Sequence, residues 1–311
     1  GNLFVPDARR FWIQPSIKYL TSYLLENPVD AIVSTGPPHS LHLIGLGLSN
    51  NTHIPWLADF RDPWTTIHYH QSLRLNKRAQ KKHLKLESKV LNNSDLVVVT
   101  SARTKKEFQN ITSVPIEVVS NGYDILEKIE PNLDTQFSIA HIGSLLTNRN
   151  PELLWEILSE LKDENRVFSK NLLIKLVGAV SEDVLESLAV FGLTENYKTL
   201  GYVSHQEAIQ IQHDVQVLLL VEMDSPETKS IIPGKLFEYI AANRPILAIG
   251  PDGSDVERIL KETNAGVYFT YTEKEKLILF LKLLNSKGGC IVSDFIPRQR
   301  YKRFLTSLPI A

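Results

Sequence analysis

The sequence predicts an α/β protein of two domains, each built on a parallel sheet, and three observations lead to this prediction. Its 311 residues are enough for two domains of ordinary size, and a composition of 43% hydrophobic and 22% charged residues is typical of a soluble globular protein. Short, continuous apolar runs alternate with segments of helical apolar spacing along the chain. Such runs are typical of strands in a parallel sheet that helices cover on both faces.

The first domain begins with a helix, expected over residues 11–25 because its apolar residues recur at helical spacing. Asn27-Pro28 ends this helix ahead of a strand at residues 31–33. The elements expected next are a helix to about Leu48, a strand over 54–60, a long helix over 73–91, and strands at 96–99 and 116–119.

The second domain follows a polar stretch without periodicity, between residues 125 and 137, which we interpret as a linker. We therefore expect one domain over residues 1–134 and another over 135–295. Strands are expected near 139–142, 173–177, 197–200, 215–220, 246–249 and 267–269, with helices at about 151–164, 182–191, 205–212, 233–242, 255–263 and 274–285.

The helix expected over residues 233–242 carries the strongest functional signal. Pro233 suits the first position of a helix, and Asn243 before a proline ends the helix ahead of a buried strand. Lys235 falls in the first turn, where free N–H groups and the helix dipole favour an anion over a cation. A bound phosphate would remove that conflict; the alternative is a solvent-exposed Lys235–Glu238 pair of little energetic consequence.

A glycine turn closes the first strand of the second domain, in the run His-Ile-Gly-Ser-Leu that contains Gly143. Ligands of open α/β sheets bind beyond the C-terminal ends of the strands, and a glycine there lets backbone N–H groups approach a phosphate. We therefore expect the Gly143 turn and the start of the helix at Pro233 to contact one diphosphate from two sides.

The run Pro-Gly-Lys-Leu-Phe-Glu-Tyr-Ile-Ala-Ala-Asn-Arg-Pro-Ile-Leu-Ala resembles the donor-site helix of retaining GT-B glycosyltransferases of the large family 4. Three segments of the first domain, 34–40, 58–64 and 120–124, are similar to bacterial members of this family and occur in the same order. The resemblance implies two Rossmann-like domains that face each other across a cleft. It also implies a C-terminal helix, residues 296–311, that packs back on the first domain.

The same resemblance implies that the first domain is truncated. The family's first domain opens with a strand and a glycine-rich loop, and neither is found in this sequence. The chain begins with Gly1, and its single methionine is Met223, so we interpret it as an expressed or processed fragment. Whether this fragment is active stays open at this point.

In the family, the glutamate of this helix holds the ribose of a sugar nucleotide, and the position that matches it here is Glu238. The resemblance implies the following donor-binding residues: Gly143, Ser144, Arg149, Lys229, Gly234, Lys235 and Glu238. Two positions depart from the family pattern, because Ser144 replaces an arginine and Ser230 replaces a second glutamate. Lys229 is expected to replace one missing cation.

Asp59 lies near the end of the strand expected over 54–60, and Arg61 and Asp62 follow it. We expect these three to be the catalytic residues, which orient the acceptor hydroxyl or the leaving phosphate. The alternative is a local Arg–Asp pair that fixes the loop before Pro63. The residues expected on the acceptor side of the cleft are His39, Asn121 and Gly122. His39 has a structural alternative as a helix cap.

The function implied by the resemblance is transfer of a sugar, with retention, from a nucleotide sugar to a saccharide or lipid-linked acceptor. The setting is bacterial cell-surface polysaccharide synthesis, and the family needs no metal or other cofactor. Three alternatives stay open: a nucleotide-sugar epimerase of the same fold, a non-catalytic nucleotide-sugar binding module, and a membrane-associated scaffold. The sequence does not identify the sugar, the base, the acceptor, the linkage or the oligomeric state.

Composition excludes several other classes of function. A formal net charge of −1, without an aromatic stacking set, argues against nucleic acid as a partner. Cys290 is the only cysteine, which fits a reducing compartment, and we expect a cytoplasmic protein. His68 and His70 supply only two ligands without a matching carboxylate pair, so no structural zinc site is expected.

The helix expected over residues 73–91 is strongly basic. It carries Arg74, Lys77, Arg78, Lys81, Lys82, Lys85 and Lys89 against the single acid Glu87. A solvated basic face is the default interpretation. The alternative is peripheral contact with an anionic membrane at its inner face, worth about 1 kcal/mol for each basic side chain near the headgroups.

Overall fold

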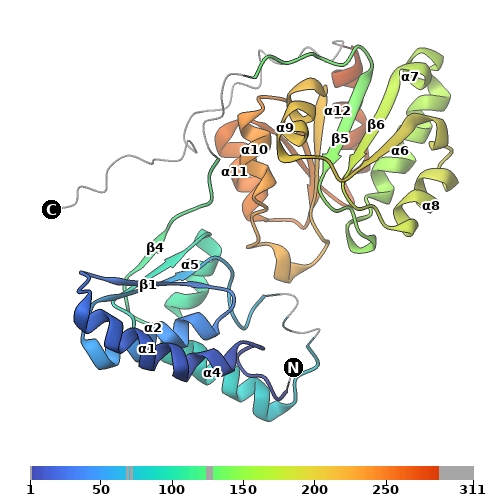
Figure 1. Ribbon diagram of the computed structural model, residues 1–311. Helices are drawn as coiled ribbons and strands as arrows, with labels where there is room; N and C mark the ends of the chain where they lie inside the picture. The colour runs from blue at the N-terminus through green and yellow to red at the C-terminus, as the bar shows by residue number, and fades with distance from the viewer. Residues whose placement is uncertain (1, 68–69, 71–72, 124–128, 287–311) are drawn as a thin grey trace. The chain divides into compact units, whose positions relative to one another are not determined.

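The computed structural model describes residues 2–67, 70, 73–123 and 129–286 of the chain (Figure 1). The chain divides into two compact units, residues 1–120 and 121–311. Each unit contains one sheet in which every strand pair is parallel. The predicted α/β class with two parallel-sheet domains is therefore confirmed.

The sheet of the first unit has four strands, arranged in chain order as β1-β2-β3-β4. The strands are β1 (Ile32–Gly36), β2 (Trp56–Phe60), β3 (Leu96–Val99) and β4 (Ile116–Val118). The helices are η1 (Arg10–Trp12), α1 (Ile13–Glu26), α2 (Ser40–Thr52), α4 (Lys77–Leu91) and α5 (Ala102–Gln109). The predicted strands are all present, since each is an apolar run.

The core of the first unit lies on one face of its sheet. Ile32, Trp56 and Phe60 pack there against apolar side chains of the helices, and Figure 1 shows α1, α2 and α4 on this side. The burial of β1 alternates, and Val33 on the opposite face is 65% exposed. Among the described residues, helices cover only one face of this sheet, so the predicted cover on both faces is not found there. Apolar runs in β1 to β4 do not by themselves reveal which side chains find a partner.

Two helices of the first unit differ from the sequence-based expectation. The helix expected over 73–91 begins at Lys77, because Asn76 is extended and its side chain accepts a hydrogen bond from Ala79 N at 2.9 Å. Helix α5 was not predicted, since Phe108 is its only buried apolar residue and gives no apolar period. Ser101 caps α5 by accepting from Thr104 N at 3.1 Å.

The sheet of the second unit has six strands in the order β10-β9-β8-β5-β6-β7. The strands are β5 (Phe137–Ile142), β6 (Leu172–Val177), β7 (Tyr197–Gly201), β8 (Val217–Val221), β9 (Ile246–Gly250) and β10 (Gly266–Thr270). The helices are η2 (Thr147–Arg149), α6 (Glu152–Glu164), α7 (Arg166–Asn171), α8 (Glu182–Val190), η3 (Thr194–Asn196), α9 (His205–Asp214), η4 (Pro226–Thr228), α10 (Lys235–Ala241), α11 (Asp255–Thr263) and α12 (Lys274–Ser286).

Helices cover both faces of this second sheet, as predicted. One core cluster joins the sheet to α6, α8 and α12, and another joins it to α10 and α11 (Figure 1). Strands β5, β8 and β9 are buried along their whole length. Asn243 follows α10 with a φ of +55°, which ends the helix where the sequence predicts, although α10 begins at Lys235 rather than Pro233.

The segment between the sheets packs on the second unit, so the units divide after Ser120 rather than after residue 134. Asp134 pairs with Lys175 of β6 at 2.7 Å, and Asn132 N donates to Asp214 at 2.7 Å. Part of the expected linker and the whole C-terminal helix expected over 296–311 lie outside the described residues.

Candidate functional sites

The strand order of the second unit reverses between β5 and β8. In doubly wound sheets, ligands bind beyond the carboxyl ends of the strands at such a reversal. β5 ends at Ile142 and β8 at Val221. The polar residues that follow these two strands, and the helix that packs beside them, are therefore the first candidate site.

Gly143 follows β5 with a φ of +106°, a conformation that favours glycine. A Cβ at this position would lie 2.9 Å from Lys235 Nζ. The lysine side chain thus extends from the start of α10 to the turn after β5. The structure brings together the two turns that the sequence predicts to share a ligand.

His141 holds Lys235 in this position. Its Nδ1 lies 3.0 Å from the carbonyl oxygen of Leu219, and its Nε2 lies 3.2 Å from Lys235 Nζ. The carbonyl requires an N–H on Nδ1, so Nε2 of the neutral ring accepts from the ammonium. Burial, together with the charge of Lys235, lowers the pKa of His141 to about 3, which keeps this ring neutral at physiological pH.

Two cationic side chains influence each other at this site, and neither forms an ion pair among the described residues, although Glu238 acts on Lys235 and Glu222 on Arg149 at longer range. Burial, and then the charge of Arg149, lowers the pKa of Lys235 to about 8. The Nε of Arg149 is buried without a hydrogen-bond partner among the described residues. No carboxylate in the described part of the chain forms an ion pair with either side chain. Buried charges are stable in proteins when they are paired, so the arrangement favours a bound anion.

Glu238 lies one turn after Lys235 on α10 and is positioned by α9. Its Oε1 lies 3.3 Å from His205 Nε2, and its Oε2 accepts from Gln212 Nε2 at 2.9 Å. Each carboxylate oxygen keeps acceptor capacity for a further hydrogen bond. The exposed Lys235–Glu238 pair considered above is not formed, because each side chain has other partners.

Glu222 follows β8 and was missed by the sequence analysis. It is 4% exposed and accepts hydrogen bonds from Ser254 Oγ at 2.9 Å and Tyr268 OH at 2.8 Å. Burial raises its pKa to about 7, against the lowering effect of these two donors. Its position directly after a buried strand could have marked Glu222 as a site residue. Its hydrogen-bond partners, Ser254 and Tyr268, lie too far along the chain for a local pattern to reveal them.

The remaining predicted donor-binding residues, Ser144, Gly234 and Lys229, lie in three different segments of the second unit. Ser144 lies half-buried in the turn after Gly143. Gly234 precedes α10, and no atom lies within 4 Å of the position of a Cβ there. Lys229 follows η4, and its carbonyl accepts from Asp255 N at 2.9 Å. No described hydrogen bond joins the Lys229 side chain to the residues around Gly143.

In the first unit, Asp59 and Arg61 connect the ends of β1 and β2. Asp59 Oδ2 accepts from Thr35 Oγ1 at 2.7 Å. Arg61 Nη2 donates to the carbonyl of Pro37 at 2.7 Å. Arg61 therefore fixes the loop after β1. Asp62 follows it in the chain and is half-buried. The predicted acceptor-side residues Asn121 and Gly122 are the first two residues of the second unit.

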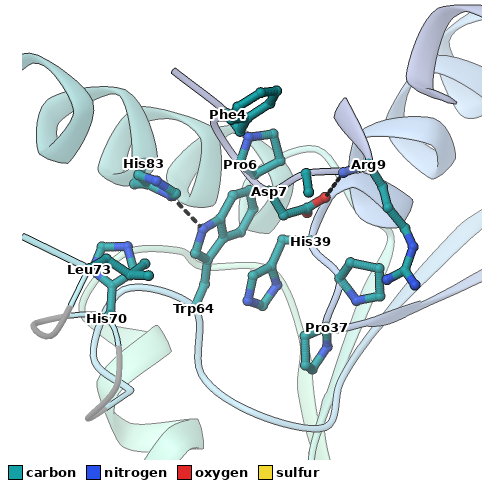
Figure 2. A pocket seen from close by; sticks show the side chains of 12 residues that line it. Phe4, Pro6, Asp7, Arg9, Pro37, His39, Trp64, His70, Leu73 and His83 are labelled. Atoms are coloured by element: carbon teal, nitrogen blue, oxygen red, sulfur yellow. Dashed lines mark hydrogen bonds between the residues drawn. The ribbon is translucent and has the colours of Figure 1, made fainter. Parts of the chain in front are cut away.

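The second candidate site is a pocket of about 550 Å³ in the first unit (Figure 2). It forms where residues 4–9 pack beside the loops that follow β1 and β2. Its lining residues are Phe4, Pro6, Asp7, Ala8, Arg9, Pro37, Pro38, His39, Trp64, His70, Leu73 and His83. His70 was considered above with His68 as a metal ligand; it lines this pocket, and His68 lies outside the described residues.

Aromatic rings form one wall of this pocket. Trp64 stacks on His39 with ring centroids 4.5 Å apart and an angle of 6° between the planes. Its Nε1 donates to His83 Nδ1 at 3.1 Å, the bond drawn in Figure 2. The alternative role of His39 as a helix cap is not observed, because its side chain makes no capping hydrogen bond to α2.

The basic helix α4 turns its lysines outward and its acid inward. The residues exposed on it are Lys77, Arg78, Lys81, Lys82, Lys85 and Lys89. Glu87 is buried and accepts from Thr65 N at 3.0 Å, and burial raises its pKa. Within the described residues, every helix is too short or too polar to span a membrane.

Comparison with known proteins assigns the fold. Residues 2–126 match the sequence family described as Glycosyltransferase Family 4, a span that covers the first unit. No curated protein sequence matches the chain. Matches among solved structures extend over both units.

One such structure is Anabaena Alr3699/HepE in complex with UDP, with a TM-score of 0.65 and 17% identity over 91% of this chain and 78% of that one. WaaG, a glycosyltransferase involved in lipopolysaccharide biosynthesis, gives a TM-score of 0.56 and 14% identity over 89% and 75%. A putative UDP-N-acetylglucosamine 2-epimerase from Listeria monocytogenes gives 0.53 and 12% over 93% and 75%. The chain therefore has the fold of the GT-B glycosyltransferases, with a first unit that is similar to family 4.

Proposed function

We propose that this protein is a glycosyltransferase that binds a nucleotide sugar in its second unit and a saccharide or lipid-linked acceptor in its first. The observation that carries the proposal is the position of Lys235, which lies against Gly143 where the strand order reverses and is influenced by the charge of Arg149. Two half-buried cations without a described ion pair match the charge of a diphosphate. A bound UDP in a protein of the same fold supports this choice of ligand.

The rest of the nucleotide sugar can be assigned around this diphosphate. Glu238 accepts hydrogen bonds from the ribose hydroxyls, and His205 and Gln212 hold its carboxylate in place for this role. The space beside Gly234 leaves room for the ligand to approach the backbone of α10. Ser144 and Lys229 stay candidate contacts of the sugar and the phosphates.

In the proposed reaction, the bond between the anomeric carbon and the diphosphate oxygen breaks, and its electron pair leaves with the diphosphate. Lys235 and Arg149 stabilise this developing negative charge. The acceptor oxygen forms the new glycosidic bond with retention of configuration, and its proton passes to the departing diphosphate. Because protein cations supply the countercharge, we propose that no metal takes part. Asp59 and Asp62 orient the acceptor, and Arg61 acts through the loop that it fixes.

Thermal stabilisation by UDP, GDP, ADP and CMP tests the donor site. A ligand at a hundred times its dissociation constant stabilises a protein by about 2.7 kcal/mol. We expect one nucleotide to stabilise the parent, and Lys235→Ala and Glu238→Ala to remove the effect. Lys276→Ala is the matched control, since this lysine is exposed on α12. Equal stabilisation of the parent and Lys235→Ala would exclude the assignment.

The epimerase neighbour favours a second candidate function, turnover of a nucleotide sugar without an acceptor. Incubation with UDP-N-acetylglucosamine alone separates the two. A new sugar nucleotide in the absence of acceptor supports the epimerase, whereas product that forms only with an acceptor saccharide supports the transferase. Binding of the nucleotide sugar without either product supports a non-catalytic nucleotide-sugar module.

The exposed basic face of α4 supports a further part of the proposal, a cytoplasmic protein that acts in bacterial cell-surface polysaccharide synthesis at the inner face of the membrane. Sedimentation with phosphatidylglycerol vesicles tests this contact. We expect binding that is lost with salt and in the double variant Lys81→Glu, Lys85→Glu, because each basic side chain near the headgroups contributes about 1 kcal/mol. The same change at Lys105 and Lys106 of α5 is the control.

A further inference from the structure

The pocket of the first unit contains polar groups that lack partners. His39 is 7% exposed, and its Nδ1 is buried without a hydrogen-bond partner among the described residues. The same holds for Nε2 of His70, which lines the same pocket. Buried polar atoms are nearly always hydrogen-bonded in native proteins. Two such atoms in one pocket therefore indicate a ligand that forms hydrogen bonds.

The charge of the lining indicates which kind of ligand fits. Burial lowers the pKa of His39 to about 3 and that of His83 to about 4, so both rings are neutral at physiological pH. The Asp7 carboxylate accepts from the backbone N–H groups of Arg9 and Ser40, both at 2.8 Å. These two hydrogen bonds occupy the Asp7 carboxylate and hold residues 4–9 against the start of α2. Arg9 is the only arginine or lysine among the described lining residues, so the pocket lacks the pair of cations that a phosphate requires.

A neutral imidazole offers one donor and one acceptor, and a sugar hydroxyl also provides both. An alkyl chain would fill the apolar walls but leave the imidazoles without partners. A nucleobase would need a free aromatic face, whereas Trp64 is stacked on His39 and only 1% exposed. The C–H groups of a sugar ring suit the walls formed by Pro37 and Pro38, and the volume lies within the range of about 300–1,000 Å³ found for small-molecule pockets.

We propose that this pocket binds an uncharged sugar residue, one hydroxyl of which forms a hydrogen bond with His39, and that this residue belongs to the acceptor. The assignment to the acceptor rests on the proposed function; the binding of a sugar does not. The lining side chains come from residues 4–9, the loops after β1 and β2, and α4, and Figure 2 shows how they surround His39 and Trp64.

Saturation-transfer NMR on the whole chain tests the pocket directly. The probes are the methyl glycosides of glucose, galactose, N-acetylglucosamine and rhamnose, with uridine and hexanol for comparison. We expect at least one glycoside to bind, and His39→Ala to weaken it at least tenfold. His39→Gln should restore part of the affinity, because an amide also offers a donor and an acceptor.

Two further variants separate binding from folding. Ala8 is exposed at the pocket, so Ala8→Trp should block the glycoside without disturbing the core. His53→Asn is the matched control, because His53 is an exposed histidine with a φ of +56° that asparagine tolerates. The control should bind the glycoside as the parent does.

The outcomes for the two sites can be told apart. Glycoside binding that is unchanged in both His39→Ala and Ala8→Trp overturns the proposal, as does binding of uridine or hexanol in this pocket in place of every glycoside. Absence of glycoside binding in a chain that still binds UDP overturns the pocket and leaves the donor site standing. Glycoside binding without any nucleotide binding supports the pocket and contradicts the proposed transferase.

Discussion

The candidate sites of the two units differ in charge, and they also differ in how the fold creates them. In the second unit the strand order reverses between β5 and β8, and the half-buried side chain of Lys235 lies at the strand ends there under the influence of Arg149. In the first unit the described strands follow one another in chain order, and the pocket is assembled from loops and residues 4–9 around neutral imidazoles. Topology thus locates the site of the second unit, whereas packing between distant segments creates the pocket of the first.

The two sheets differ in a related way. Strands β5, β8 and β9 are buried on both faces, whereas β1 alternates between buried and exposed side chains. Parallel sheets normally have both faces covered. In the described part of the chain, the second sheet therefore draws stability from helices on each side, and the first from helices on one side.

The largest expected effect tests this difference between the sheets. Leu219 of β8 is fully buried, so Leu219→Ala should lower the free energy of unfolding by about 2–5 kcal/mol. Val33→Ala should lower it by less than about 0.5 kcal/mol, because Val33 lies on the open face. Urea denaturation measures both values. Similar losses in the two variants would contradict an open face in the first sheet.

A second prediction concerns the buried acid of the second unit. Because folding raises the pKa of Glu222 to about 7, the folded state binds more protons than the unfolded state between its ordinary pKa and 7. Stability should therefore fall as pH rises through this window, by about 3 kcal/mol in total. Denaturation at several pH values should show a flatter profile for Glu222→Gln. The exposed control Glu186→Gln should keep the parent profile, and an unchanged profile in Glu222→Gln would refute the assignment.

Lys235 should show a conflict between stability and binding. Its pKa is lowered to about 8, so below that pH the folded state carries the cost of a buried ammonium, and this cost disappears as pH rises above 8. Lys235→Met should stabilise the ligand-free protein at pH 7 by about 1–2 kcal/mol, less than the full shift because His141 loses its donor. It should also weaken UDP binding. Chemical denaturation and calorimetry measure the two effects, and loss of stability in this variant would argue against an unpaired cation.

The smallest expected effect is a contrast in pH dependence between the two ligands. UDP affinity should decrease above pH 8, by up to about tenfold per unit, as Lys235 loses its proton. Glycoside affinity should stay constant from pH 6 to 9, because His39 and His83 have pKa values of about 3 and about 4. Titration calorimetry across this range compares them. Parallel pH profiles would remove the distinction between a cationic and a neutral site.

Much of the second unit's site could be predicted from the sequence. Gly143, Lys235 and Glu238 each lie at the end of a strand or the start of a helix, which local pattern reveals, and the strand ends of a parallel sheet lie along one edge. The residues that support them were missed. His141 contacts a lysine 94 residues away, and Gln212 contacts a glutamate 26 residues away, so no local pattern connects them.

The sequence alone determined the type and order of nearly all helices and strands, because apolar spacing and capping residues act over a few neighbours. Only the tertiary structure decided how charge and burial are distributed. It joined Asp7 to the start of α2, 33 residues along the chain, and thereby formed the pocket around His39. Within the described residues it also left Val33 of the first sheet exposed and brought Lys235 under the charge of Arg149. The physical reason is that burial and pKa depend on which distant groups meet, and a linear pattern does not contain that information.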